Sequence, residues 1–250
     1  MAEKETAVDL DFLEQAAESG FENMGAGEIS TPLLLISQAL SKNVADGSMP
    51  VGHFYNSITG KDYGNELRVI VCHFDKMWYE WKPNQGGLVG RYPVGGLEDV
   101  VGDKYTGMLH GENKVEEKYV YLVYLPDFPE DGFLVFSSTG GNMKYLKAWN
   151  TQMTYLRTPG GRQAPLFSAI WKLSLNKDKN KQGNIYYSCN NGEGKAGITF
   201  DSWVSKEVYE QAVLPARQTA SQAIAIADMR DQDAAVEADT NGNVVNTTDF

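Results

Sequence analysis

The sequence predicts a mainly β protein with a few helices, and three observations lead to this prediction. Its central part, residues 52–187, is dominated by alternating runs of β-branched and aromatic residues. One stretch with clear helical periodicity, residues 143–157, interrupts these runs. The chain has 250 residues, of which 42% are apolar, and this is enough to bury a sizeable core.

The N-terminal residues predict two helices. In residues 8–19, Leu10, Leu13 and Ala17 recur at helical spacing among acidic residues. We expect a second, short helix over residues 32–40, because Pro32 suits a first helical turn and the leucines after it form an apolar face.

The next segments predict strands. Residues 67–74 alternate in polarity, and the pattern continues through residues 77–82. Residues 119–125 form a β-branched and aromatic run that ends at a proline-rich turn, and residues 133–136 are its predicted hairpin partner.

The remaining segments complete the prediction. The helix over residues 143–157 is followed by two strands, residues 165–175 and residues 185–189, which we expect to pair across a polar and basic connection. A last helix is predicted from Ser205 to about residue 227, kinked or divided at Pro215.

This order of elements is that of an OB-fold, a five-stranded, partly open Greek-key barrel with one helix between its third and fourth strands. In such barrels the loops joining strands 1–2 and 4–5 bind oligonucleotides. The predicted loop between the fourth and fifth strands contains Lys177, Lys179 and Lys181.

The net charge of −11 is unevenly distributed. Residues 1–30 hold eight acids and one base, residues 221–250 hold six acids and one base, and the 190 residues between them hold 20 bases and 19 acids. We therefore expect an acidic N-terminal arm (1–30), an OB-fold-like domain with a C-terminal helix (31–227) and a flexible acidic tail (228–250). The average acidity then no longer excludes nucleic acid as a partner.

Signals for catalysis are weak. His53, His73 and His110 lie far apart in the sequence, without the spacing of metal ligands, and no common catalytic motif is present. We expect a protein that is not an enzyme and that has no cofactor or metal.

The sequence also predicts the compartment. It starts without a basic and apolar secretory leader, and no apolar run is long enough to cross a bilayer. Cys72 and Cys189 fit buried, reduced thiols. We expect a cytoplasmic protein.

Aromatic and basic residues predict a surface for single-stranded nucleic acid. Such a surface needs aromatic rings for unpaired bases beside cations that follow the phosphates. Packing of the aromatic rings in the barrel and simple solvation of the lysines are the structural alternatives. The candidates are Trp78, Trp81, Lys82, Arg91, Tyr121, Lys144, Lys147, Lys172, Lys177, Lys179 and Lys181.

The acidic C-terminal segment has two interpretations. Such segments commonly serve solubility, but this one ends in an aromatic residue beside an acid, which suits a short peptide hook for a partner. It can also compete with DNA phosphates for the basic part of the body. The candidate partner-binding residues are Asp228, Asp231, Asp233, Glu237, Asp239, Asp249 and Phe250.

The chain resembles bacteriophage single-stranded DNA-binding proteins of the short-tailed-phage replication type. The resemblance covers roughly residues 20–200 and the tail, and it is carried by Gly25-Ala-Gly-Glu-Ile-Ser-Thr-Pro-Leu-Leu-Leu-Ile-Ser-Gln-Ala-Leu-Ser, Gly52-His-Phe-Tyr-Asn-Ser-Ile-Thr-Gly, Glu80-Trp-Lys-Pro and Gly86-Gly-Leu-Val-Gly. It implies an OB-fold core, an acidic tail and a terminal Phe that contacts replication proteins.

These observations lead to one functional expectation and one alternative. We expect a sequence-independent protein that coats and protects single-stranded DNA in phage replication or recombination, in the cytoplasm of the infected host cell. Its tail would recruit a polymerase, primase-helicase or nuclease. The alternative is a phage structural or protein-interaction β-domain without a nucleic-acid role. Whether the N-terminal arm packs on the barrel or makes a homodimer is open.

Overall fold

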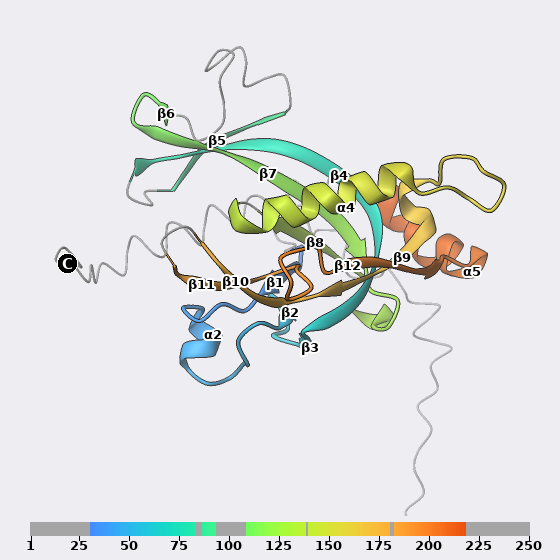
Figure 1. Cartoon of the computed structure of the whole chain (residues 1–250), viewed down its shortest axis with the longest axis horizontal. Helices are drawn as coiled ribbons and strands as arrows, with labels where there is room; N and C mark the ends of the chain where they lie inside the picture. The colour runs from blue at the N-terminus through green and yellow to red at the C-terminus, as the bar shows by residue number, and fades with distance from the viewer. Residues whose placement is uncertain (1–30, 84–86, 94–108, 139, 181–182, 219–250) are drawn as a thin grey trace, which may run out of the picture.

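The protein folds as one strongly curled β-sheet with a helix in its hollow, as the computed structural model shows (Figure 1). The structure describes residues 31–83, 87–93, 109–138, 140–180 and 183–218. The prediction of a mainly β protein with few helices is confirmed. No helix within these ranges has the length and apolar character needed to span a bilayer.

Among the described residues the main sheet has ten strands instead of the five expected. Eight of them are neighbours in the order β12 (Ile198–Trp203), β9 (Ala169–Ser174), β4 (Glu66–Trp81), β7 (Asn113–Tyr124), β8 (Phe133–Ser138), β1 (Leu33–Ile36), β2 (Phe54–Asn56) and β3 (Asp62–Gly64). Two more lie beside this path, β5 (Leu88–Pro93) against β4 and β6 (Leu109–His110) against β7. A separate two-stranded sheet is made of β10 (Asn176–Lys179) and β11 (Ile185–Ser188).

Within the described ranges the helical elements are few and mostly short. They are α2 (Lys42–Ala45), α4 (Met143–Tyr155), α5 (Lys206–Val208), three 3-10 turns, η2 (Pro129–Asp131), η3 (Gly140–Asn142) and η4 (Leu166–Ser168), and a π-helical turn, η5 (Tyr209–Val213).

Strands β4 and β7 form the long, bent spine of the sheet. They pair antiparallel from Ile70↔Tyr124 to Trp81↔Lys114, with a register shift between Val71 and His73. Such an irregularity bends a strand and increases its twist. As a result, the first part of β4 pairs with β9 in the body, and its last part pairs with β5 in a projecting arm (Figure 1).

Helix α4 fills the hollow of the curled sheet. The predicted apolar face is confirmed, because Leu146, Trp149 and Met153 are all buried. The indole of Trp149 stacks on Tyr121 of β7 at a centroid distance of 4.9 Å and meets Trp171 of β9 edge-on at 6.2 Å. Large aromatic contacts of this kind dominate core energetics, so α4 fixes the curvature of the sheet beneath it.

The other face of the spine is covered by the C-terminal helical segment, residues 206–218. Its Val213 and Ala216 pack against Ile70 and Leu122. The predicted helix starts where expected, with the hydroxyl of Ser205 accepting from the backbone N–H of Val208. The π-helical turn η5 lies just before Pro215, which cannot donate a helical hydrogen bond, and this explains the predicted irregularity.

Two predicted elements are wrong. Residues 32–40 do not form a helix, because Leu33–Ile36 form β1, which pairs parallel with β8 and antiparallel with β2. Residues 185–189 do not pair with residues 165–175. The segment Ile185–Ser188 pairs with Asn176–Lys179, and β9 pairs instead with β4 and with β12, a strand that was not predicted.

The two cysteines are buried, as predicted. Burial raises the pKa of each thiol to about 12, for Cys72 and for Cys189. Both therefore stay in the thiol form at neutral pH.

Candidate nucleic-acid interface

The β10–β11 hairpin carries the predicted basic loop between β9 and β12. Its register places Lys177 opposite Tyr187 and Lys179 opposite Ile185, so these four side chains share one face. Both lysines are exposed, and neither has an ion-pair partner within the described ranges. Lys181, at the tip, lies outside the described residues. The hairpin thus presents two available ammonium groups on one face.

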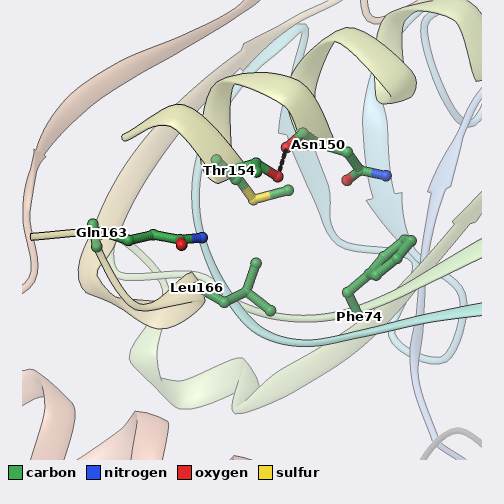
Figure 2. Close-up of a pocket in the computed structure, with 7 residues that line it drawn as sticks. Phe74, Asn150, Thr154, Gln163 and Leu166 are labelled. Carbon is green, nitrogen blue, oxygen red and sulfur yellow. Dashed lines mark hydrogen bonds between the residues drawn. The ribbon is translucent and has the colours of Figure 1, made fainter. Parts of the chain in front are cut away.

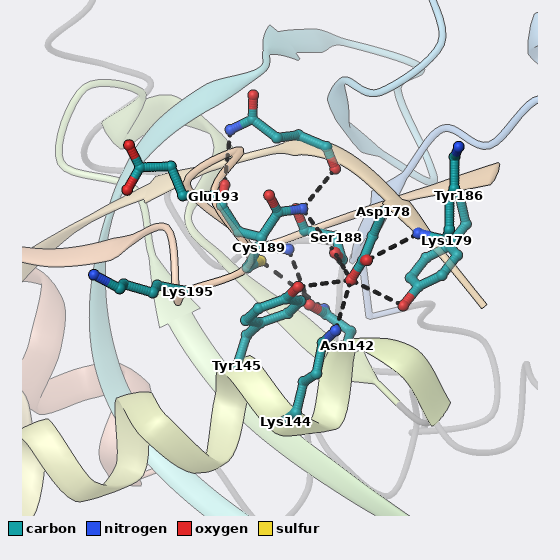
Figure 3. Close-up of polar contacts among 12 residues, drawn as sticks. Asn142, Lys144, Tyr145, Asp178, Lys179, Tyr186, Ser188, Cys189, Glu193 and Lys195 are labelled. Carbon is teal, nitrogen blue, oxygen red and sulfur yellow. Dashed lines mark hydrogen bonds and ion pairs between the residues drawn. The ribbon is translucent and has the colours of Figure 1, made fainter. Parts of the chain in front are cut away.

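The opposite face of the hairpin is organised by Asp178 (Figure 3). Its carboxylate accepts hydrogen bonds from the hydroxyls of Tyr145 (2.6 Å) and Tyr186 (3.0 Å), and it pairs with the ammonium of Lys144 (3.0 Å). Burial opposes ionisation of the group, but the hydrogen bonds from Tyr145 and Lys144 outweigh it and hold the pKa of Asp178 well below its usual range. Contacts with Tyr145 and Asp178 in turn raise the pKa of Lys144. Asp178 therefore fastens the hairpin to α4 as a charged group.

The hairpin is also fastened to the N-terminal part of the sheet. The side-chain amide of Gln38 accepts from the backbone N–H of Tyr187 (2.8 Å) and donates to its carbonyl (2.9 Å), as a neighbouring strand would. A Cβ at Gly52 would lie 2.2 Å from the ring of Tyr187, so only glycine lets this ring dock there. Gln38 thus holds the backbone of Tyr187, and Gly52 makes room for its ring.

Beside the exposed lysines lies a shallow hollow of 330 Å³. Its other rim is the loop 190–196, in which Gly192 and Gly194 have positive φ angles of 83° and 80°. Lys195 of this loop is exposed and has no ion-pair partner within the described part of the chain. The hollow, which we call the hairpin hollow, is lined by Lys177, Asp178, Lys179, Ile185, Asn190, Gly192 and Gly194.

Helix α4 connects the hairpin with the projecting arm. Lys144 pairs with Asp178 at one end, and Lys147, one turn along, lies 3.8 Å from Glu117 of β7. Glu117 also pairs with Lys76 of β4 at 3.0 Å. Lys144 and Lys147 therefore belong to a row of acidic and basic side chains between the hairpin and the projecting arm. Neighbouring carboxylates partly balance the charges of these two lysines.

Two of the three predicted aromatic residues, Trp78 and Tyr121, are buried in the core. Trp78 is 5% exposed and packs against Val115 and Tyr92, and Tyr121 is completely buried, with its hydroxyl donating to Asn150 (2.9 Å). Neither ring presents a face to solvent. Trp81 is half-buried and stacks on Tyr79, with a distance of 6.1 Å between the ring centroids.

The remaining predicted cations lie on other elements. Lys82 is exposed at the end of β4, and the backbone of Arg91 is in β5, while its side chain lies outside the described part. Lys172 lies opposite Arg68 of β4 and pairs with Glu66 at 2.8 Å. The partner-binding residues Asp228, Asp231, Asp233, Glu237, Asp239, Asp249 and Phe250 lie outside the described residues.

Several residues of this site were not among the predicted ones. Tyr186 and Tyr187 belong to the hairpin itself, Tyr145 donates to its Asp178, and Gln38 binds its backbone. Lys195 lies on the neighbouring loop 190–196. The adjacent tyrosines beside a lysine-rich turn were a usable signal for a stacking surface. The contribution of Gln38 had no local signal, because it lies 149 positions from Tyr187.

The described residues hold no group of three or more His, Cys, Asp or Glu side chains arranged to bind a metal ion. The chain matches no curated protein and no solved structure. A family model described as Pam3 phage gp34-like protein matches residues 3–225, which is most of the chain. The protein is therefore a bacteriophage protein that belongs to the Pam3 phage gp34-like family.

Proposed function

We propose that this protein binds single-stranded DNA without sequence preference and protects it during phage replication or recombination in the infected cell. The observation that carries the proposal is the pair of exposed lysines, Lys177 and Lys179, that line the hairpin hollow, with Lys195 exposed on the adjoining loop. Among the described residues none of the three has an ion-pair partner. Exposed ammonium groups around a shallow hollow suit a flexible, phosphate-rich strand.

The local electrostatics support the proposal. The hairpin contains one acid, Asp178, and its charge is already engaged by Tyr145, Tyr186 and Lys144. A phosphate at Lys177 or Lys179 therefore meets little competition from this carboxylate. Tyr187 is partly exposed and lies opposite Lys177 on the face that carries both lysines, so its ring is the candidate for stacking with a base.

The order of the strands also supports the OB-fold-like part of the proposal. Three strands that are neighbours in the sheet, β4, β7 and β8, are followed in the chain by α4 and then by β9, which returns to lie beside β4. The spatial order β9-β4-β7-β8 supports the Greek-key assignment that we propose. On this assignment the hairpin is in the loop between the fourth and fifth strands, one of the two loops with which OB-folds bind oligonucleotides. Strand β1 lies on the open side of β8, where the barrel is extended.

The test is a salt-dependent titration with oligo(dT), followed by fluorescence anisotropy. We expect the wild-type affinity to fall steeply with salt, and each of Lys177→Ala and Lys179→Ala to reduce the slope of log K against log salt by about 0.7. Lys206→Ala is the matched control, because this exposed lysine lies on α5 and pairs with Glu210. A wild-type protein without measurable, salt-dependent binding would refute the proposal.

A phage structural or protein-interaction role is the second candidate. Strand β12 forms one edge of the main sheet. Its Phe200 and Trp203 are 40% and 38% exposed, and their ring centroids lie 5.1 Å apart. An edge strand with exposed aromatic residues is a usual place for a protein contact. Absence of DNA binding together with loss of self-association or phage-protein capture in Trp203→Ser would favour this role.

A further inference from the structure

A second cavity, separate from the hairpin hollow, lies between the latter half of α4 and strand β4 (Figure 2). Its volume is 190 Å³, below the roughly 300–1,000 Å³ of sites for drug-sized ligands. A space of this size accommodates a single ring system. It is lined by Phe74, Asn150, Met153, Thr154, Gln163, Ala164 and Leu166.

The apolar side of this cavity is rigid. Phe74 points into the cavity from β4. Its ring packs against Tyr119, edge-on at a centroid distance of 5.4 Å, and against Tyr121, tilted at a centroid distance of 5.0 Å. Leu166 faces the same space from the segment after the 157–163 loop. A flat ring that enters the cavity therefore meets an aromatic surface that is already positioned.

The polar side offers donors and acceptors without partners. The amide oxygen of Asn150 accepts a hydrogen bond from the hydroxyl of Tyr121. The NH₂ group of Asn150 points away from that bond, and no described residue accepts a hydrogen bond from this NH₂ group. The side-chain amide of Gln163 has no hydrogen-bond partner among the described residues. Together they can donate to or accept from the edge of a heterocycle.

Two arginines flank the same loop. Arg157 forms an isolated β-bridge with Gln163, and Arg162 is its neighbour in the chain. Both are exposed, and within the described ranges neither has an acidic partner; Arg157 donates to the carbonyls of Thr154 and Leu156. Tyr155, 72% exposed, is at the end of α4.

We propose that this cavity receives one unpaired nucleobase of a bound strand. Phe74 and Leu166 form its apolar walls, the amides of Asn150 and Gln163 contact the base edge, and Arg157 and Arg162 meet the adjoining phosphates. Because an amide presents both a donor and an acceptor, the cavity can take different bases, which agrees with binding without sequence preference. The inference rests on the proposed function, but it uses residues outside the hairpin.

The test compares two strands of equal length, oligo(dT) and an abasic sugar-phosphate chain, by fluorescence anisotropy at one salt concentration. Gln163→Ala should weaken binding of oligo(dT) by about 2- to 10-fold, the effect of one lost hydrogen bond. Phe74→Leu should weaken it by about 5-fold or more, as expected for lost stacking. Neither change should affect the abasic chain.

Gln152→Ala is the matched control, because Gln152 is an exposed amide on α4 that does not line the cavity. Gln163 has no side-chain partner in the described part of the chain, so its variant should keep the wild-type melting temperature. If Gln163→Ala and Phe74→Leu bind oligo(dT) like the control, or weaken both strands equally, the cavity does not hold a base, although wild-type DNA binding would leave the proposed function intact. If the wild type binds neither strand, the proposed function itself fails, and the cavity proposal with it.

Discussion

Replacing Asp178 with Asn should make the protein less stable and, at the same time, better at binding DNA. The substitution keeps an oxygen that accepts from Tyr145 and Tyr186 but removes the charge. Hydrogen bonds to a charged group are roughly twice as strong as neutral ones, so each tyrosine contact should lose about 1 kcal/mol. The exposed Lys144 contributes about 0.5 kcal/mol at most. Because the Asn side chain is also easier to bury, we expect a net loss of about 1–2 kcal/mol.

Urea denaturation at neutral pH measures this loss, and its pH dependence checks the cause. The pKa of Asp178 is lowered in the folded state, so its contribution is fully present above the unfolded pKa of about 4 and is lost as the pH falls toward the folded value. The stability difference between wild type and Asp178→Asn should therefore narrow in acid. A variant as stable as wild type at pH 7, or a difference independent of pH, would refute the role assigned to this carboxylate.

The DNA measurement separates charge from structure. Asp178→Asn frees Lys144, and we expect tighter oligo(dT) binding at low salt, with a salt slope larger by about 0.7. Glu193→Gln is the control, because this exposed acid on the neighbouring loop has no ion-pair partner among the described residues. It removes the same charge and should leave stability unchanged. Weaker DNA binding by Asp178→Asn would show that hairpin geometry matters more than charge.

Two further predictions concern other parts of the chain. Deleting residues 228–250 should strengthen oligo(dT) binding at low salt, because the segment's acids compete with phosphates, and an unchanged affinity in the same titration would remove tail competition from the proposal. Gly52→Ala should destabilise the fold by about 1–3 kcal/mol in urea denaturation, because of a positive φ of 80° and the contact with Tyr187. Gly47→Ala is its control, since Gly47 has a similar φ of 77° and open space around it. Equal losses in the two variants would show that the contact with Tyr187 contributes nothing.

The sequence predicts the longest elements of this fold and misplaces the shortest. Helix α4 is long enough for its periodicity to be unambiguous. The four apolar residues Leu33–Ile36 fit a helix or a strand equally well, and only pairing with β8 and β2 decides between them. Local patterns cannot report such partners, because they are distant in the sequence.

The candidate site, too, is only partly predictable from the sequence. The basic loop at Lys177 and Lys179 is readable from the sequence, since runs of lysine beside turn residues are normally exposed. The burial of Tyr121 is not, because β7 is covered on both faces and alternation then no longer marks an outer side. The burial of Trp78 in β4 is not readable either, because it depends on packing against Val115 and Tyr92 of other strands. In the sequence, Asp178 stands out only as one of the few acids within a basic segment. In the fold, its carboxylate accepts hydrogen bonds that anchor the hairpin.

The bond between Gln38 and Tyr187 has a consequence for synthesis of the chain. The two residues are separated by 149 positions, so the hairpin cannot reach its final place until most of the polypeptide has left the ribosome. Strands β4, β7 and β8 are complete much earlier. The basic hairpin is therefore among the last parts to assemble, after strands β4, β7 and β8 have been synthesised.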